Sequence, residues 1–248
     1  MTGHYNVGKY GLFILRSEDI EDEVENILNQ YCPTCLEEPK EIDVEKLIED
    51  MGLNLYYANM SKNSEVLGAF VFNKGVIPTY IDDVLEYKKY DEKTIIIDSK
   101  IAEEEDPRLK FTYGHELGHF VTQYDLFHVN NNQLSLFDIE EEKQTAVICK
   151  REKVNPENTL NKRKKLETKE DWQEWQANYF SSALLIPKYT LRIALKDYLD
   201  NYDVMDQTPL LNKLEEDKLK SLINDLSETY NVSFQMMKNR LKTLKYLD

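Results

Sequence analysis

Residues 115–119 read His-Glu-Leu-Gly-His, and this H-E-x-x-H pattern says more about fold and chemistry than any other part of the chain. Two histidines four residues apart on an α-helix project from one face, which suits two ligands of one tetrahedral Zn²⁺. Glu116 follows the first histidine, where a carboxylate can accept a proton from an attacking water. With only four histidines in the chain, chance is a weak explanation. The pattern predicts His115 and His119 as metal ligands and Glu116 as the catalytic base.

The residues around this pattern predict a helix that can carry it. Asp106-Pro107 is a start signal, since Asp can cap a helix and Pro is tolerated at its first position. Apolar positions surround the two histidines, at Phe111, Leu117, Phe120 and Val121. Gly118 costs roughly 1 kcal/mol of helix stability relative to Ala. A residue without a side chain beside His119 leaves room for a substrate or for a neighbouring backbone.

A second helix is expected at 170–187, started by Thr168 or Asp171 and ended by Pro187. Two histidines and a water leave one position of a tetrahedral zinc site to another protein ligand. Glu174 is the candidate, because small residues on its helix face allow close packing against the first helix. Asn178, one turn later, is a candidate to orient a histidine ring. An ordinary amphipathic helix with an exposed Glu174 remains open on geometry alone. The small residues on the face of Glu174 are Ala177 and Ser181.

The two motifs together resemble those of a known family. H-E-L-G-H followed by E-x-x-A-N-x-F-x-x-x-L-L-x-P is similar to the pattern of the ImmA/IrrE metallopeptidases of bacteria and phages. The stretches at 94–98 and 111–112 look like the strand and helix lead-in of that family, so the resemblance covers roughly residues 40–190. In the second motif the matching residues are Glu174, Ala177, Asn178, Phe180, Leu184, Leu185 and Pro187.

The resemblance implies a fold, a cofactor and a substrate class. It implies an α+β, zincin-like domain of minimal gluzincin type, with a small mixed or antiparallel sheet beside the active-site helices. One catalytic Zn²⁺ would be held by His115, His119 and Glu174, with Glu116 as base. Family members typically cleave a helix-turn-helix transcriptional repressor and so derepress phage, mobile-element or stress genes.

The expected domain organisation has a peptidase domain at 1–190 and a helical region at 191–248. Glu174 lies 55 positions after His119, a longer gap than a compact member of the family should have. Residues 126–169 therefore read as an insertion, either a lid beside the active site or a surface excursion without a role. Short strands or a hairpin are expected there, from Leu134, Leu136 and Phe137 with Ala146, Val147 and Ile148.

The rest of the first domain shows helix caps and strand patterns. Ser17 is expected to cap a first helix, and Asp43 a short one that Gly52 closes. Strands are expected at 53–58, 66–72 and 94–98.

Composition excludes several classes of protein. The formal net charge is −15, which disfavours direct nucleic-acid binding because phosphates would be repelled. Three cysteines do not make a secreted disulfide framework, and no apolar run reaches the roughly 18–20 residues that span a bilayer. These features favour a cytoplasmic protein away from membranes, and the charge suits a basic partner such as a DNA-binding repressor. The oligomeric state is left open.

Cys32-Pro33-Thr34-Cys35 is a C-x-x-C pattern. It could be half of a second metal site with Cys149 as third ligand, or a redox pair. The default interpretation is a turn flanked by thiols, because no second C-x-x-C completes a ligand set.

The C-terminus reads as helix, tight turn and helix, over 222–230 and 234–247, with Ser233 as cap. This layout resembles a helix-turn-helix. The second helix also carries an apolar stripe, so packing against the catalytic domain or docking of a repressor is favoured over DNA contact. The stripe consists of Phe234, Met237, Leu241 and Leu244.

Two functions of different class follow. The first is a zinc endopeptidase in which Tyr113, Tyr124 or Tyr179 stabilises the oxyanion; spacing does not choose among them. The second is a zinc-containing antirepressor that binds and sequesters its partner without cutting it. The presence of Glu116 favours the first, since a scaffold has no need of a base.

Overall fold

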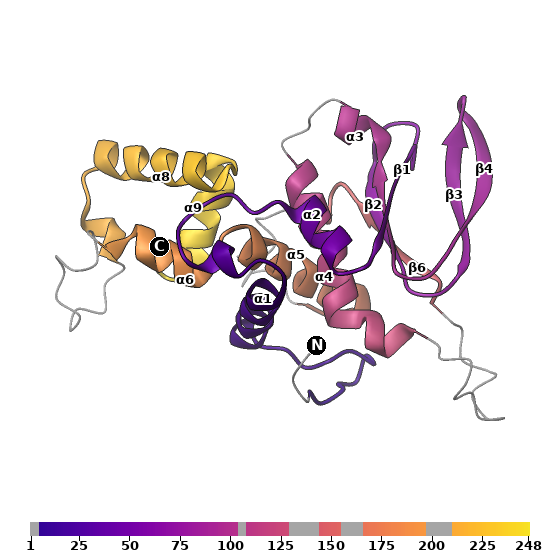
Figure 1. Ribbon diagram of the computed structural model, residues 1–248, viewed down its shortest axis with the longest axis horizontal. Coiled ribbons are helices and arrows are strands. Elements are labelled where there is room, and N and C mark those ends of the chain that lie inside the picture. The colour runs from indigo at the N-terminus through magenta and orange to yellow at the C-terminus, as the bar shows by residue number, and fades with distance from the viewer. Residues whose placement is uncertain (1–4, 104–107, 129–143, 155–165, 197–209) are drawn as a thin grey trace.

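A computed structural model describes residues 5–103, 108–128, 144–154, 166–196 and 210–248. The fold is α+β, as predicted: a small sheet lies beside a group of helices, and the C-terminal helices gather at the far end (Figure 1). No helix in these ranges combines the length and the apolarity that crossing a bilayer requires.

The main sheet has the order β1-β5-β2-β6. β1 (Asn54–Ala58) pairs parallel with β5 (Thr94–Asp98), and β2 (Val66–Val71) pairs antiparallel with both β5 and β6 (Ala146–Lys150). The three strands expected upstream of the H-E-x-x-H helix are confirmed to within one residue. β6 confirms a strand at 146–148, whereas Leu134, Leu136 and Phe137 lie outside the described residues.

Both faces of this sheet are covered. Successive side chains of each strand point to opposite faces, and each face packs into its own hydrophobic core. Phe70, Ile95 and Ile97 pack in the large core shared with the helices. Ala69 and Ile96 face the opposite way, into a smaller core. That side holds the hairpin of β3 (Gly75–Ile81) and β4 (Val84–Tyr90), which lies away from the helices (Figure 1). The hairpin contributes Ile77 and Tyr90 to the smaller core.

The β3–β4 hairpin was not predicted from the sequence. Its turn is Asp82-Asp83, with φ of 49° and 62°. Two positive φ values are typical of the tight hairpin turns in which Asn-Gly and Asp-Gly dominate, so Asp-Asp is a weak signal. Pro78 inside β3 also argues against a strand unless its missing N–H falls where no ladder bond is needed.

The two predicted active-site helices are α4 (Leu109–Phe127) and α5 (Lys169–Leu185). Thr168 caps α5 by accepting from the Asp171 backbone N–H. The expected start of α4 at Asp106-Pro107 lies outside the described residues. A Cβ on Gly118 would come within 2.9 Å of Ala177 Cα, so the two helix backbones touch there. Gly118 therefore makes room for a neighbouring backbone, one of the two predicted uses.

Shorter helices precede the sheet and follow β5. α1 (Ser17–Tyr31) begins after Arg16, so Ser17 is not its cap; instead the Asp19 carboxylate accepts from the Arg16 backbone N–H and guanidinium. α2 (Val44–Asp50) is capped by Asp43 as predicted, and Gly52 follows it with φ of 76°. The remaining short elements are η1 (Pro33–Leu36) and α3 (Ser99–Glu103).

The C-terminal helices follow the predicted layout. Asn231 is left-handed and ends the longer helix, and the Ser233 side chain caps the next by accepting from the Met236 N–H. Met237 and Leu241 of the predicted stripe are fully buried. The elements of this region are α6 (Lys188–Ala194), η4 (Leu210–Lys213), α8 (Glu216–Tyr230) and α9 (Phe234–Thr243).

Candidate metal centre

His115 and His119 lie one turn apart on α4, and both rings are fully buried. Their Nε2 atoms are 3.1 Å apart, with the ring planes nearly perpendicular at 84°. Two ring nitrogens this close present lone pairs to the same point in space. The helix thus aims both imidazoles at one place, as the four-residue spacing predicts.

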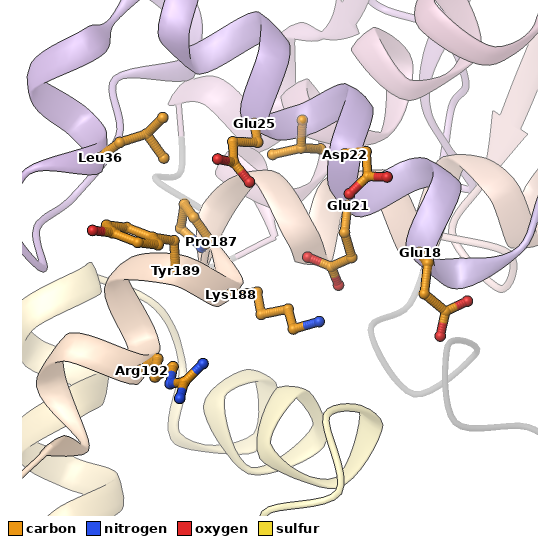
Figure 2. A pocket seen from close by; sticks show the side chains of 10 residues that line it. Glu18, Glu21, Asp22, Glu25, Leu36, Pro187, Lys188, Tyr189 and Arg192 are labelled. Carbon is orange, nitrogen blue, oxygen red and sulfur yellow. The ribbon is translucent and has the colours of Figure 1, made fainter. Parts of the chain in front are cut away.

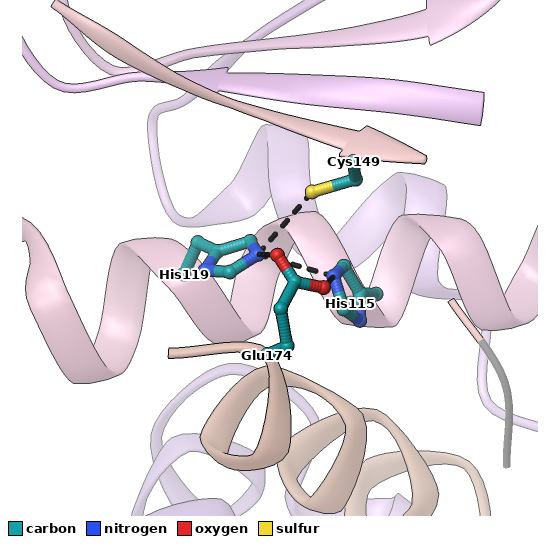
Figure 3. A group of neighbouring side chains, drawn as sticks. All are labelled: His115, His119, Cys149 and Glu174. Atoms are coloured by element: carbon teal, nitrogen blue, oxygen red, sulfur yellow. Dashed lines mark hydrogen bonds and ion pairs between the residues drawn. The ribbon is translucent and has the colours of Figure 1, made fainter. Parts of the chain in front are cut away.

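Two further donors reach the same place from other elements. Glu174 of α5 puts Oε2 3.4 Å from His115 Nε2 and Oε1 3.9 Å from His119 Nε2. Cys149 of β6 puts Sγ 3.3 Å from His119 Nε2. Figure 3 shows the four side chains converging from α4, α5 and β6. One ligand atom from each lies within 4.8 Å of every other.

The geometry of this group fits a metal ion. Two nitrogens bound tetrahedrally at about 2.0–2.1 Å from one zinc ion lie about 3.3 Å apart, close to the 3.1 Å between the two histidines. Within the described chain, Glu174 Oε2 is buried without a hydrogen-bond partner, a state that a bound cation would relieve. The buried His115–His119–Cys149–Glu174 group can bind a metal ion, and its nitrogen, sulfur and oxygen donors are those that zinc accepts.

Gln123 sets the protonation of His119, and sequence reasoning missed it. Its Nε2 donates to the Gln173 carbonyl at 3.1 Å, which leaves Oε1 to face His119 Nδ1 at 3.0 Å. Because Oε1 can only accept, Nδ1 carries the ring proton and Nε2 keeps its lone pair for the metal. Their sequence positions could have indicated this role: Gln123 lies one helical turn after His119, and Gln173 is next to Glu174.

Burial keeps His119 neutral. Loss of solvent, followed by the nearby His115, lowers the pKa of His119 to about 4. At neutral pH the ring therefore holds a free lone pair, which is the form that binds metal.

Glu116 lies beside the group and is fully buried. Its Oε2 accepts from the Cys149 thiol at 3.4 Å, while Oε1 has no hydrogen-bond partner in the described chain. Gly68 of β2 makes the space for this carboxylate, because a Cβ there would come within 2.6 Å of Oε1. Burial raises the pKa of Glu116 well above its ordinary value, which makes it a stronger base than an exposed carboxylate.

The cysteines are arranged differently from the prediction. Cys32 and Cys35 are joined by a disulfide, so their sulfurs are not metal ligands there. Cys149 is instead a free, buried thiol in the group described above. The disulfide agrees with the redox pair that the C-x-x-C pattern left open, and it contradicts both the default of two free thiols and the alternative of a three-cysteine metal site. Sequence could not show that β6 pairs with β2 and carries Cys149 to the histidines.

None of the three tyrosine candidates directs its ring or hydroxyl into this group. At about 100° per residue, Tyr113 and Tyr124 lie roughly 120° and 140° around α4 from His119, the histidine nearer to each around the helix. The hydroxyl of Tyr113 bonds to Tyr57 at 2.7 Å, and the ring of Tyr124 stacks on His128. Tyr179 donates to Glu21 at 2.8 Å. The prediction of an oxyanion partner among them is not supported by this arrangement.

Asn178 has a contact that the sequence did not suggest. Its Nδ2 donates to the Lys153 carbonyl at 2.9 Å. Lys153 follows β6 in the chain, so this bond ties α5 to the segment that brings in Cys149. Part of 126–169, predicted as an insertion, thereby contributes directly to the group.

A separate surface cavity of about 220 Å³ lies between α1 and α6 (Figure 2). Acidic side chains of α1 line one wall, and Lys188 and Arg192 of α6 line the other. None of its lining residues belongs to the metal-binding group, so it is not part of the candidate centre.

Comparison with known proteins supports a peptidase. Residues 153–242 match the family model Peptidase_M78, the IrrE N-terminal-like domain. The match confirms the resemblance to ImmA/IrrE peptidases and includes Glu174, although it begins after His115 and His119. No curated protein matches the chain. The peptidase-family match and the buried His/His/Cys/Glu group together indicate a metallopeptidase.

Proposed function

We propose that this chain, with its match to the M78 peptidases, is a zinc-dependent endopeptidase that cleaves a helix-turn-helix transcriptional repressor. The observation that carries the proposal is the position of Glu116, a buried carboxylate in contact with Cys149, whose sulfur lies in the same group as the donors of His115, His119 and Glu174. A site that only holds metal needs ligands but no unligated base beside them.

Each of these residues has a chemical task in peptide hydrolysis. His115, His119 and Glu174 would hold zinc. When bound, zinc would act as the Lewis acid that polarises the scissile carbonyl. Gln123 keeps the proton of His119 on Nδ1, so that Nε2 would be free to bind the metal. Glu116, buried against the Cys149 thiol, accepts the proton of the attacking water and passes it to the leaving amine.

The proposed substrate class rests on the family resemblance and on charge. Repressors of this kind bind DNA and so carry basic surfaces, whereas this chain has a formal net charge of −15. Opposite charge accelerates encounter between two proteins. A DNA-bound substrate would also place the reaction in the cytoplasm.

The test is cleavage of a candidate repressor encoded beside the gene, followed by mass spectrometry of the products. Zinc-loaded chain that carries Cys149→Ala should cut at one or a few bonds, and adding Glu116→Gln should retain zinc but lose about 10²-fold or more of that rate. Asp125→Asn, an exposed carboxylate on the same helix, should leave the rate unchanged. Cys149→Ala is the parent for these rates, because the Cys149 thiol lies against Glu116. Equal cleavage by Cys149→Ala and by Cys149→Ala/Glu116→Gln would refute the mechanism.

One observation favours the second candidate, a zinc-containing antirepressor that sequesters its partner. The four-donor group is buried and leaves no donor position open among the described residues, as in zinc sites with a structural role. If derepression in cells survives Glu116→Gln, binding alone is sufficient and the peptidase proposal fails.

A further inference from the structure

Cys149 lies where a catalytic zinc site needs an open position. It belongs to β6, one of the two edge strands of the main sheet, and its side chain has no exposed surface. Its sulfur is 3.3 Å from His119 Nε2 and 3.4 Å from Glu116 Oε2, between a metal ligand and the base. The attacking water would have to occupy this same space.

The number of donors points to a closed site. Catalytic zinc sites keep three protein ligands and leave the fourth position to water or substrate, whereas four protein ligands are typical of closed sites. Here His115, His119 and Glu174 supply three ligands, and Cys149 is a fourth within the same 4.8 Å limit. Thiolate is also among the strongest ligands that a protein offers to zinc.

Burial supports the same conclusion independently. The side chains of His115, Glu116 and His119 have no exposed surface, and Glu174 is only 9% exposed. Glu116 Oε1 is fully buried and has no hydrogen-bond partner in the described chain. An extended peptide therefore cannot bring its carbonyl to the metal while the surrounding elements stay in place.

The strand β6 covers the sheet edge that a substrate would need. Extended peptides commonly bind by adding a strand to an exposed sheet edge. β6 pairs antiparallel with β2 from Val66 to Val71, and the pairing shifts register between Val66 and Gly68, opposite Cys149. β6 therefore has the place and the antiparallel direction of an added strand, and Cys149 projects from it towards the metal group (Figure 3).

We propose that Cys149 is the fourth ligand of the metal and that β6 is an internal plug, so the structure is the latent form of the peptidase. This rests on the proposed function, whose regulation it supplies. The thiol loses its proton to solvent when sulfur binds the metal and takes one up when it leaves, so the switch needs no oxidant. Activation then consists of displacing β6 and Cys149 from β2 and the metal.

X-ray absorption at the zinc edge tests the ligand without reference to cleavage. The zinc-loaded full chain should show one sulfur neighbour at about 2.3 Å. Cys149→Ser and Cys149→Ala should lose it, while the double variant Cys32→Ser/Cys35→Ser, the matched control, should keep it. A wild-type spectrum with only nitrogen and oxygen neighbours would overturn the proposal.

Binding of acetohydroxamate, a small metal chelator, tests the plug. Its apparent affinity should rise about tenfold or more in Cys149→Ala, because the closed state no longer competes for the metal. Equal affinity for wild-type and variant protein would overturn the plug. A sulfur neighbour and tighter acetohydroxamate binding without any cleavage by Cys149→Ala would uphold the closed site and refute the proposed peptidase function instead.

Discussion

Arg240 on α9 and Glu21 on α1 form a buried ion pair, with N–O distances of 2.7 and 2.8 Å. Arg240 has no exposed side-chain surface, and its Nε donates to the Ile186 carbonyl at the end of α5. Tyr179 of α5 donates to the same Glu21 carboxylate. One ion pair thus joins α9 to α1 and to α5, the helix that carries Glu174.

Removing one partner of this pair should destabilise the protein strongly. Glu21→Gln leaves a buried guanidinium without its counter-charge, which typically costs about 3–5 kcal/mol. Urea unfolding should report this loss. Glu25→Gln, an exposed acid on the same helix, should change the free energy of unfolding by about 0.5 kcal/mol or less. Equal effects of the two substitutions would mean that the pair contributes nothing.

The pH dependence of stability should show the same pair. Burial by itself would raise the pKa of Glu21, but the charge and hydrogen bonds of Arg240 outweigh it and lower the pKa below its ordinary value. A lowered carboxyl pKa stabilises the fold fully above the unfolded value of about 4.3 and loses that contribution as pH falls through the folded value. Acid titration should therefore destabilise wild type more steeply than Glu21→Gln below about pH 4.

Periodicity and caps were enough to predict the elements that hold the core of the site. The four-residue spacing of His115 and His119, and the Thr168 cap with the stop at Pro187, are local signals. Local patterns of this kind predict side-chain positions correctly because the periodicity of a single helix fixes which residues share a face. The resemblance then singled out Glu174, which geometry alone had left undecided.

What sequence could not reveal depends on contacts between distant segments. Cys149 reaches the metal group only because β6 pairs with β2, and nothing near residue 149 specifies that pairing. Gln123 fixes His119 only because Gln173 fixes the amide of Gln123. The same limit applies to the cysteines: C-x-x-C spacing left a three-cysteine metal site open, and the Cys32–Cys35 disulfide and the position of Cys149 beside the histidines exclude it.

Gln123→Met should weaken metal binding. The substitution preserves volume but removes the oxygen that holds the proton of His119 on Nδ1. Loss of such a supporting hydrogen bond typically lowers metal affinity about 10–100-fold. Competition with a chromogenic chelator would measure it. Gln176→Met is the matched control, since Gln176 is equally buried on α5 but donates to the Phe13 carbonyl; equal losses in both variants would point to general destabilisation.

Gly118→Ala should destabilise the protein, opposite to the usual effect of this change in a helix. Alanine ordinarily gains roughly 1 kcal/mol over glycine at an interior helical position. Here the new Cβ would lie 2.9 Å from Ala177 Cα and 3.0 Å from the Ala177 carbonyl oxygen. Both are backbone atoms, so the overlap is relieved only if α4 and α5 move apart, and overpacking of this kind costs about 1–3 kcal/mol. Separation would also draw Glu174 away from the two histidines, so zinc affinity should fall together with the urea midpoint. A variant more stable than wild type, with unchanged zinc affinity, would show that this close contact does not position Glu174.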